Sequence, residues 1–484
     1  MPSDADLRIG QTLWPALRAS NGRAGIEALL PLIERFPPGG VIVFGEGQDN
    51  VAKLIAELRA AVPGDLLVSS DLERGCGQQV REFGNLPTAM AIAACQLPNA
   101  AYDAGLLTAI EARAAGIDVV FAPVADVNTA ATNPIIATRS FGDDPHRVAA
   151  LCSAFSAGLN DGGVLAVAKH WPGHGSTVQD SHEQLARVTS SAEQLQAVDL
   201  LPFRTLIAEN IGGLMVGHLE VPALDPVPGR PATASPNLVF DLLRRQLGYE
   251  GLVVTDALDM GGFASEPAAG LDVLQSGLDV LLMPADPLAT AVALKEAHAR
   301  HHLADEVLDR AVSRIATARS RVRSHTLQAA KPHADLGQIL AAASLTNRDN
   351  TVLPLPKGRA VDLMLFGVDD SGMVVPAFKE SLVAGGVSLN GDGASVALVI
   401  TSVRAWAGSA RLPAKDRARL HWAIENGRID QVVVLGSPYE LLDLPQGCPA
   451  LLAYEATPES AHAAAKVLLG RATAPGRLPV GNGR

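Results

Sequence analysis

The first two-thirds of the chain alternate short apolar runs with stretches of helical length, and this alternation constrains the fold most. Runs rich in Val, Ile and Leu suit strands buried on both faces of a parallel sheet. We predict eight such strands, at residues 8–13, 41–44, 66–70, 117–122, 164–168, 212–217, 252–255 and 278–283. Helix-length segments, such as residues 50–61 and 145–161, lie between most of them. Eight parallel strands with helical crossovers predict a (β/α)8 barrel, also called a TIM barrel.

A second α/β pattern follows the barrel, as the length of 484 residues already suggests. Residues 305–322 have the pattern of an amphipathic helix, and a polar stretch follows them. Further apolar runs predict the strands of a small, doubly wound parallel sheet, at residues 361–366, 396–401, 431–435 and 450–454. We therefore predict three segments: a catalytic TIM barrel at 1–325, a linker at 326–344 and a small α/β domain at 345–484.

Charge and cysteine content restrict the partners and the compartment. The 39 basic and 51 acidic side chains give a net charge of −12, which argues against nucleic acid or an anionic membrane as the main partner. No uncharged apolar run approaches the roughly 18–20 residues that crossing a bilayer requires, and the N-terminal sequence does not resemble a secretory signal. The four cysteines lie far apart, at positions 76, 95, 152 and 448, and form no CxxC pair. We expect a cytoplasmic protein without a disulfide framework.

Ionisable residues follow five of the predicted barrel strands. They are Asp71 and Glu73, Asp126, Lys169 and His170, His218, and Asp256. A TIM barrel builds its active site at the carboxyl ends of its strands. Each residue alone is as well explained as a solvated loop charge, but five strand ends together favour an active site at this rim.

The strongest local motif is KHWPGHGSTVQDSH, residues 169–182. It begins at a predicted strand end, and Pro172, Gly173 and Gly175 prevent regular structure after it. Asp180 and His182 are two residues apart, so in an extended segment their side chains point to the same side. A carboxylate beside a histidine fixes the imidazole tautomer and stabilises the imidazolium. Such a histidine can give a proton to a leaving oxygen and later take one from water.

Two other interpretations of this motif stay open. His170, His174 and His182 lie close in sequence and could bind a metal, but their spacing fits no zinc signature and no HExxH helix occurs. The motif could also be a structural loop with satisfied hydrogen bonds. We predict no metal and no cofactor.

The second motif is GLVVTDALDM, residues 251–260, in which Asp256 follows a predicted strand. A carboxylate there could attack the anomeric carbon of a sugar or stabilise an oxocarbenium ion. The alternative is a helix N-cap, which is also common after a strand. Spacing alone does not decide between them.

At these residues the chain resembles glycoside hydrolase family 3, and in particular its β-N-acetylglucosaminidase branch. The loop at 169–182 is similar to the KHFPGHGxxxxDSH signature of that branch, with Trp171 in place of Phe. Similar segments run through nearly the whole chain: FAPVADVN (121–128), RSFGDDP (139–145), LMVGHLEVPALD (214–225), GLVVTDALDM, LGSPYELLDLP (435–445) and GRLPV (476–480).

The resemblance implies a role for each matching position. Asp256 falls on the nucleophile, and His182 on the acid/base with Asp180 as its partner. The positions that hold the sugar fall on Asp71, Arg139, Lys169 and His170, and we add His218 from its place at the rim. Arg81 matches a sugar-binding arginine only if the chain loops out, because DLERGCGQQVR is two residues longer than the family's DxEGGxVxR. The second domain is also shorter than in many two-domain relatives.

The resemblance therefore implies an enzyme that removes terminal, non-reducing β-linked N-acetylglucosamine with retention of configuration. Its expected partner is a small carbohydrate, with cell-wall muropeptide turnover as the expected context. A β-glucosidase of the same family is the first alternative, although such enzymes generally lack this loop and take a glutamic acid from the second domain. A phosphorylase is the second, because a histidine acid/base carries no negative charge to repel phosphate. A non-catalytic sugar-binding barrel is disfavoured, because every expected catalytic position is filled.

Overall fold

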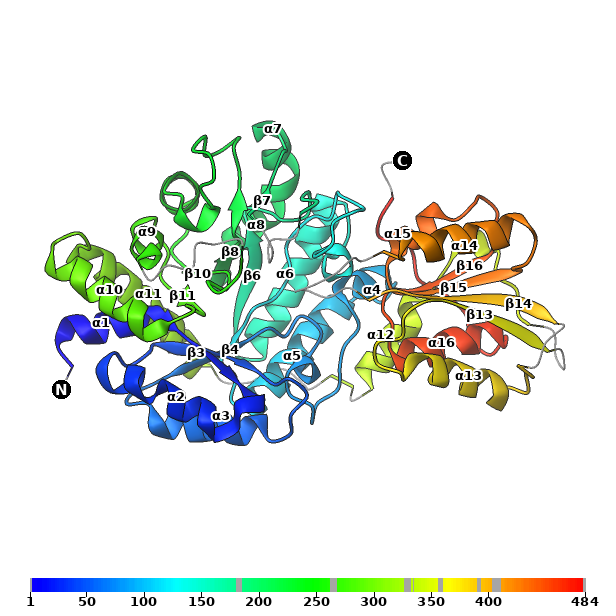
Figure 1. Cartoon of the computed structure of the whole chain (residues 1–484), viewed down its shortest axis with the longest axis horizontal. Coiled ribbons are helices and arrows are strands. Elements are labelled where there is room, and N and C mark those ends of the chain that lie inside the picture. The colour runs from blue at the N-terminus through cyan, green and yellow to red at the C-terminus, as the bar shows by residue number, and fades with distance from the viewer. Residues whose placement is uncertain are drawn as a thin grey trace. The chain divides into compact units, whose positions relative to one another are not determined.

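The computed structural model of the chain describes residues 2–179, 185–261, 268–325, 332–333, 335–355, 360–389, 393–402 and 411–481. The predicted acid/base pair, Asp180 and His182, lies outside these residues. The chain divides into two compact units, which are treated separately below (Figure 1). Unit 1 comprises residues 1–85, 101–127 and 148–332, and unit 2 comprises residues 86–100, 128–147 and 333–484.

Unit 1 contains a closed parallel barrel. Seven strands pair in the order β10-β8-β6-β5-β4-β3-β2, and their bounds are Leu252–Thr255, Gly213–Val216, Leu165–Trp171, Val119–Val120, Leu67–Ser70, Gly40–Phe44 and Ala16–Arg18. The first strand is split at Pro15, and its first half, β1 (Leu13–Trp14), pairs with β11 (Leu281–Leu282). A parallel bridge between Val254 and Val280 joins β11 back to β10. Among the described residues, strands at eight positions thus form a closed ring, which confirms the predicted TIM barrel.

Helices connect the strands and cover the barrel. They are α2 (Gly22–Arg35), α3 (Val51–Ala61), α5 (Ala100–Ala115), α6 (Pro145–Asp161), α8 (Leu200–Ala208), the π-helix η6 (Asn237–Gln246), α9 (Ala269–Gln275), α10 (Pro287–Ala299) and α11 (Asp305–Arg323). The three predicted helices, at 50–61, 145–161 and 305–322, are confirmed within one residue at each end. Apolar side chains from the strands fill the barrel, including Ile42, Leu67, Val167, Val254 and Val280.

The first predicted strand, at residues 8–13, is wrong. Residues Asp4–Thr12 form the helix α1 instead, and the barrel strand begins at Leu13. The reason is local: the Ser3 side chain accepts a hydrogen bond from the Asp6 backbone N–H, and the Asp6 carboxylate accepts one from the Ser3 N–H. This reciprocal capping box starts a helix at Asp4, and that helix continues through Thr12, most of the segment predicted as a strand.

Unit 2 is a three-layer α/β unit with the strand order β12-β16-β15-β14-β13. The parallel strands are β13 (Val361–Gly367), β14 (Ala394–Ile400), β15 (Gln431–Leu435) and β16 (Ala450–Ala453), which confirms the predicted doubly wound sheet. Helices α13 (Val374–Ala384) and α16 (Pro458–Leu468) cover one face, and α14 (Ala414–Glu425) and α15 (Pro438–Asp443) cover the other (Figure 1). The short strand β12 (Thr346–Asn347) pairs antiparallel with β16 at the edge and was not predicted.

Unit 2 also takes segments from elsewhere in the chain. The helix α12 (Leu336–Ser344) lies within the stretch 326–344 that we predicted as a linker. Two segments that lie between barrel strands in the sequence, residues 86–100 and 128–147, belong to unit 2. We call them excursions, and the first contains the helix α4 (Ala89–Ala94). The boundaries 1–325, 326–344 and 345–484 themselves stay a prediction.

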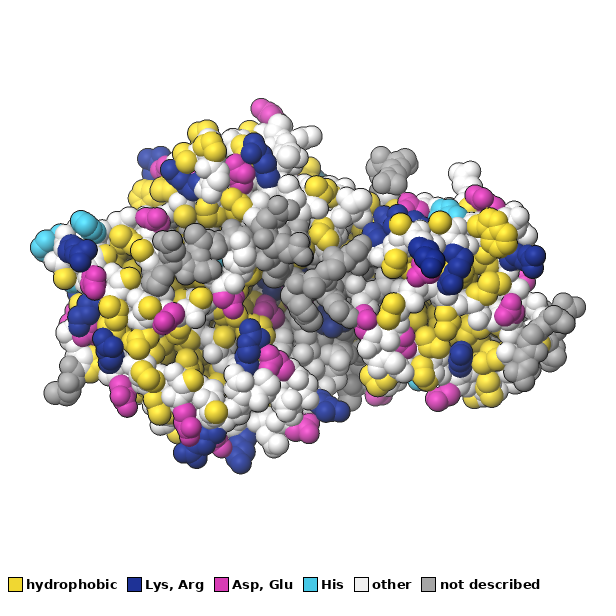
Figure 2. All heavy atoms as spheres, in the orientation of Figure 1, with side chains coloured by type: hydrophobic (Ala, Val, Ile, Leu, Met, Phe, Trp, Pro, Cys, Tyr) yellow, Lys and Arg dark blue, Asp and Glu magenta, His cyan; other side chains and the backbone are white. Residues whose placement is uncertain are grey.

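On the face in Figure 2, Lys and Arg side chains are interspersed with Asp and Glu side chains. Within the described ranges, no helix combines the length and apolarity that crossing a bilayer requires. The four cysteines are free and buried.

Candidate functional site

Lys169 joins two of the predicted rim residues. It follows Ala168 in β6, at the carboxyl end of the barrel strands, and its side chain is buried. Its Nζ lies 2.6 Å from Asp71 Oδ1 and 2.7 Å from Glu73 Oε1. The pairing of β6 with β8 shifts register between Ala168 and Trp171, an irregularity of the kind found beside active sites. The structure thus brings the strand ends of β4 and β6 together, as the rim pattern predicts.

Asp126 is fully buried and contacts the first part of the loop at residues 169–182. Its Oδ2 lies 2.7 Å from His170 Nδ1, and its Oδ1 accepts hydrogen bonds from the backbone N–H groups of His170 at 3.2 Å and His174 at 2.7 Å. Burial alone would raise the pKa of Asp126, but the charge and hydrogen bond of His170 and the contacts of His174 hold it below its usual value. An ionised Asp126 therefore fixes the orientation of the His170 ring.

We expect Asp126→Asn to lower kcat/KM by about 10- to 100-fold, because the amide is a poorer acceptor for the donors of the loop. The matched control is Asp118→Asn. Asp118 is also buried and ionic, but it pairs with Arg59 and Arg323 at the amino-terminal end of β5. The control should lose stability without a loss of kcat/KM, as measured by steady-state kinetics and thermal unfolding. Equal kinetic losses in both variants would assign Asp126 to the scaffold alone.

His174 is a buried, neutral member of the loop. Thr177 Oγ1 donates to the His174 carbonyl at 3.0 Å and lies 2.6 Å from its Nδ1. Burial, followed by the charge of His170, lowers the pKa of His174 to about 4. The ring of His174 meets that of His170 edge to face, with centroids 5.9 Å apart. These contacts make His174 a support for His170.

Asp256 follows β10 at the same end of the barrel, and its side chain is partly exposed. Its backbone N–H donates to Val216 O at 2.8 Å, and its Oδ1 accepts from the Ala257 N–H at 2.9 Å. Desolvation would raise the pKa of Asp256, but the charges of His170 and His218, the Ala257 hydrogen bond and Lys169 hold it below its usual value. Asp256 is thus an anion at neutral pH, as a nucleophile must be.

The alternative role of Asp256 as a helix N-cap does not fit this geometry. An N-cap side chain accepts from the second or third following residue and begins a helix. The Asp256 carboxylate accepts from the next residue, and no helix begins among residues 256–261. The next described helix is α9, which begins at Ala269.

The remaining predicted sugar ligands lie in different surroundings. His218 is completely buried, and both of its ring nitrogens contact protein atoms. Arg81 is exposed, and its Nη1 lies 3.4 Å from the Gly47 carbonyl oxygen. Arg139 belongs to the excursion at 128–147 in unit 2, where it donates to Ile135 O at 3.3 Å. In that unit Asn128 holds the excursion through a hydrogen bond to the hydroxyl of Tyr439. The roles of Arg81 and Arg139 stay predictions.

A buried acid lies behind the loop. Asp199 ends the π-helix η4 (Leu195–Asp199) and is 2% exposed. A Cβ on Gly173, whose φ is +128°, would lie 2.7 Å from the Asp199 Cβ, so only glycine fits there. Asp199 Oδ1 has no hydrogen-bond partner among the described residues. Burial and then the charge of Asp126 raise the pKa of Asp199 to about 7.

This raised pKa predicts a pH-dependent cost in stability. The folded protein keeps the Asp199 proton up to about pH 7, whereas the unfolded chain releases it near pH 4. Wild type therefore loses roughly 4 kcal/mol of unfolding free energy as the pH rises from 4 to 8, relative to Asp199→Asn. We expect the variant to unfold at a higher temperature than wild type at pH 8 and to lose this advantage at pH 4. Parallel pH curves of the unfolding midpoint would contradict the assignment.

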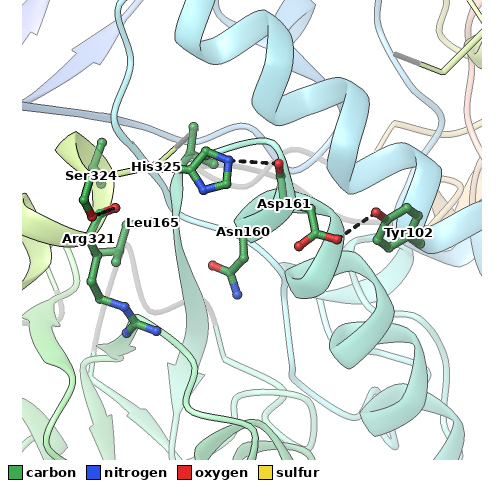
Figure 3. A pocket seen from close by; sticks show the side chains of 10 residues that line it. Tyr102, Asn160, Asp161, Leu165, Arg321, Ser324 and His325 are labelled. Atoms are coloured by element: carbon green, nitrogen blue, oxygen red, sulfur yellow. Dashed lines mark hydrogen bonds between the residues drawn. The ribbon is translucent and has the colours of Figure 1, made fainter. Parts of the chain in front are cut away.

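A large pocket lies at the other end of the barrel. It has a volume of about 790 Å³ and is lined mainly by the ends of α6 and α11 and the start of β6 (Figure 3). Asp161 accepts a hydrogen bond from the Tyr102 hydroxyl at 2.8 Å, and its carbonyl oxygen lies 3.0 Å from His325 Nε2. Because TIM barrels place their chemistry at the carboxyl ends of the strands, this pocket is separate from the candidate site.

Sequence reasoning assigned no role to three residues that the structure puts beside the predicted ones: Glu73, Asp126 and His174. Glu73 and Asp126 already stood at strand ends, so their position was the available signal. For His174 the motif left open a metal ligand or a member of a structural loop. No group of three His, Cys, Asp or Glu side chains in the described part of the chain is placed to hold a metal ion. The absence of a catalytic metal stays a prediction.

Comparison with known proteins places this geometry in context. Residues 30–318 match the family model described as the glycosyl hydrolase family 3 N terminal domain. A curated β-hexosaminidase from Methylococcus capsulatus is 38% identical over 267 residues, which cover 53% of this chain and 78% of that protein.

Among the solved structures that cover the chain almost completely, two are named for different activities. One is a family 3 β-N-acetylglucosaminidase from Paenibacillus sp. strain FPU-7, with a TM-score of 0.80, 26% identity and 99% of both chains covered. The other is the β-glucoside phosphorylase BglX, with a TM-score of 0.85, 23% identity, and coverage of 99% of this chain and 93% of that one. The second likeness shows a common fold.

Proposed function

Because this chain belongs to glycoside hydrolase family 3, we propose that it is a retaining, exo-acting β-N-acetylglucosaminidase with Asp256 as its nucleophile. The observation that carries the proposal is the ionised Asp256 carboxylate at the carboxyl end of β10, beside the loop that Asp126 holds. The β-hexosaminidase from Methylococcus capsulatus and the β-N-acetylglucosaminidase from Paenibacillus support the choice of sugar.

In the proposed reaction Asp256 attacks the anomeric carbon, and the bond to the leaving oxygen breaks. His182, oriented by Asp180, gives that oxygen its proton. The glycosyl-enzyme ester on Asp256 is then hydrolysed by a water molecule whose proton His182 takes. Two inversions at one carbon give net retention. A His–Asp pair replaces the second carboxylate of the common retaining mechanism, so the usual distance rule for two carboxylates does not apply.

We assign the binding of the sugar hydroxyls to Asp71, Lys169 and His170. The Lys169 Nζ is paired with two carboxylates, so its position is fixed before the sugar arrives. Asp71 is 26% exposed and can still accept hydrogen bonds from a ligand. Arg139 and Arg81 are proposed as further ligands on the resemblance of their motifs alone.

The choice of sugar and acceptor is tested by one assay. Turnover of a chromogenic β-N-acetylglucosaminide should exceed that of the matching β-glucoside by at least about 100-fold, and inorganic phosphate should not change the product. Preference for the β-glucoside would favour a β-glucosidase. Formation of a sugar 1-phosphate would favour a phosphorylase, the second candidate, which the fold of BglX brings into consideration.

We further propose turnover of cell-wall muropeptides in the cytoplasm as the context. Four free, buried cysteines fit a reducing compartment. The release of N-acetylglucosamine from purified muropeptides would support this context. Activity on chitin oligosaccharides but not on muropeptides would contradict it.

A further inference from the structure

His218 is completely buried and contacts Ala257, the residue that follows the proposed nucleophile. It follows β8, whose last residue, Val216, pairs with Thr255 of β10. One ring nitrogen, Nε2, lies 3.1 Å from the carbonyl oxygen of Ala257, and the other, Nδ1, lies 2.9 Å from the Thr233 hydroxyl. A carbonyl oxygen only accepts hydrogen bonds, so Nε2 carries a proton.

These contacts connect His218 to Asp256 through one residue. Ala257 receives the His218 hydrogen bond on its carbonyl and donates its own N–H to Asp256 Oδ1 at 2.9 Å. The Asp256 N–H is held at 2.8 Å by the carbonyl of Val216, two residues before His218. The last residue of β8, Val216, and His218 just after it therefore hold the backbone of residues 256–257 at two points.

We propose that His218 is a positioning residue: it holds the Ala257 backbone so that the Asp256 carboxylate keeps the orientation needed for attack, and it does not bind the sugar. The proposal rests on the proposed role of Asp256 as nucleophile. Thr233, in the 3-10 turn Ala232–Ala234, fixes the ring by occupying Nδ1. With Nδ1 and Nε2 both engaged, His218 presents no unoccupied ring nitrogen to a ligand.

Electrostatics adds to this geometric role. The charge of His218 is one of the influences that lower the pKa of Asp256, after desolvation, which raises it, and the charge of His170. His218 therefore both orients the nucleophile and favours its ionised form. Loss of the imidazole should move the acidic limb of the pH–rate profile to higher pH.

Kinetics separates a positioning residue from a sugar ligand. His218→Ala should lower kcat on an activated aryl substrate by about 100-fold, the usual cost of a misplaced reacting group, and change KM less than twofold. His218→Gln keeps an N–H donor and should recover at least about tenfold of that loss. His298→Ala, on α10, is the control and should match wild type. A rise in KM at unchanged kcat would mean that His218 binds the sugar and would overturn the proposal.

A second measurement does not depend on activity. In a double-mutant cycle of thermal unfolding, the shift caused by Asp256→Asn should differ by a few °C between wild type and the His218→Gln background. Additive shifts would overturn the positioning role. If wild type turned over none of the sugars while the coupling was present, the proposed function would fail and the structural link between His218 and Asp256 would stand.

Discussion

Asp256→Ala is expected to reduce kcat by roughly 10⁴- to 10⁶-fold, the range found when a covalent nucleophile is removed. The structure supplies the reason. The carboxylate at the end of β10 is anionic and accepts a hydrogen bond from the Ala257 N–H, and the methyl group of an alanine cannot form the ester intermediate. Steady-state kinetics with an activated aryl substrate measures the loss. A variant that kept the wild-type kcat would show that Asp256 is not the nucleophile.

A true N-cap aspartate of the same unit provides the matched control. Asp286 precedes α10, and its side chain accepts a hydrogen bond from the Ala289 N–H at 2.8 Å. Asp286→Ala should lower stability by about 1 kcal/mol and leave kcat unchanged. Asp256→Ala should show the opposite pattern, with activity lost and the unfolding midpoint retained.

His182→Ala is expected to have the second largest effect, and its size should depend on the leaving group. An activated phenolate departs without a proton, so glycosylation needs little acid catalysis. A sugar hydroxyl is a much poorer leaving group, so its departure depends strongly on acid catalysis. The second step would still lack its base, so the glycosyl-enzyme should accumulate. Azide should then rescue turnover as an external nucleophile. The measurement is a series of aryl leaving groups with and without azide.

Asp180→Asn should give a milder version of the same pattern, because it disturbs the imidazole without removing it. Its loss of rate should rise with the pKa of the leaving group, as for His182→Ala. Equal losses across all leaving groups, with no rescue by azide, would assign His182 to binding or to the scaffold.

The barrel could be predicted because its strands are buried on both faces and are therefore almost purely apolar. The apolar runs around Val167 in β6 and Val253 in β10 are buried and too short to form a helix of ordinary length. The four parallel strands of unit 2 were recognisable for the same reason. Strand ends were recognisable by the ionisable residues that follow, such as Lys169 and Asp256.

Two of the elements that escaped prediction have signals that are not hydrophobic runs. The helix α1 depends on the reciprocal Ser3–Asp6 cap, and Ile9 is apolar enough to read as the start of a strand. The strand β12 has two residues, Thr346 and Asn347, and exists only because β16 offers an edge. Edge pairing of this kind is decided by tertiary contacts.

The site could be predicted only in part, for a related reason. A sequence places Asp126 and His218 at strand ends but does not say what they contact. The structure shows that Asp126 faces the His170 ring, and that His218 faces Ala257. Contacts between side chains from different strands depend on the closure of the barrel, which no local pattern encodes. The roles of such residues had to come from geometry.

Covalent labelling tests the central claim most directly. A 5-fluoro N-acetylglucosaminyl fluoride should slow both steps and trap the intermediate, and intact-mass analysis should show one glycosyl group per chain. Peptide mapping should place that group on Asp256, within GLVVTDALDM. An adduct on another carboxylate would contradict the assignment of Asp256 as the nucleophile. Turnover of the probe without any adduct, in both wild type and the His182→Ala variant, would contradict it as well.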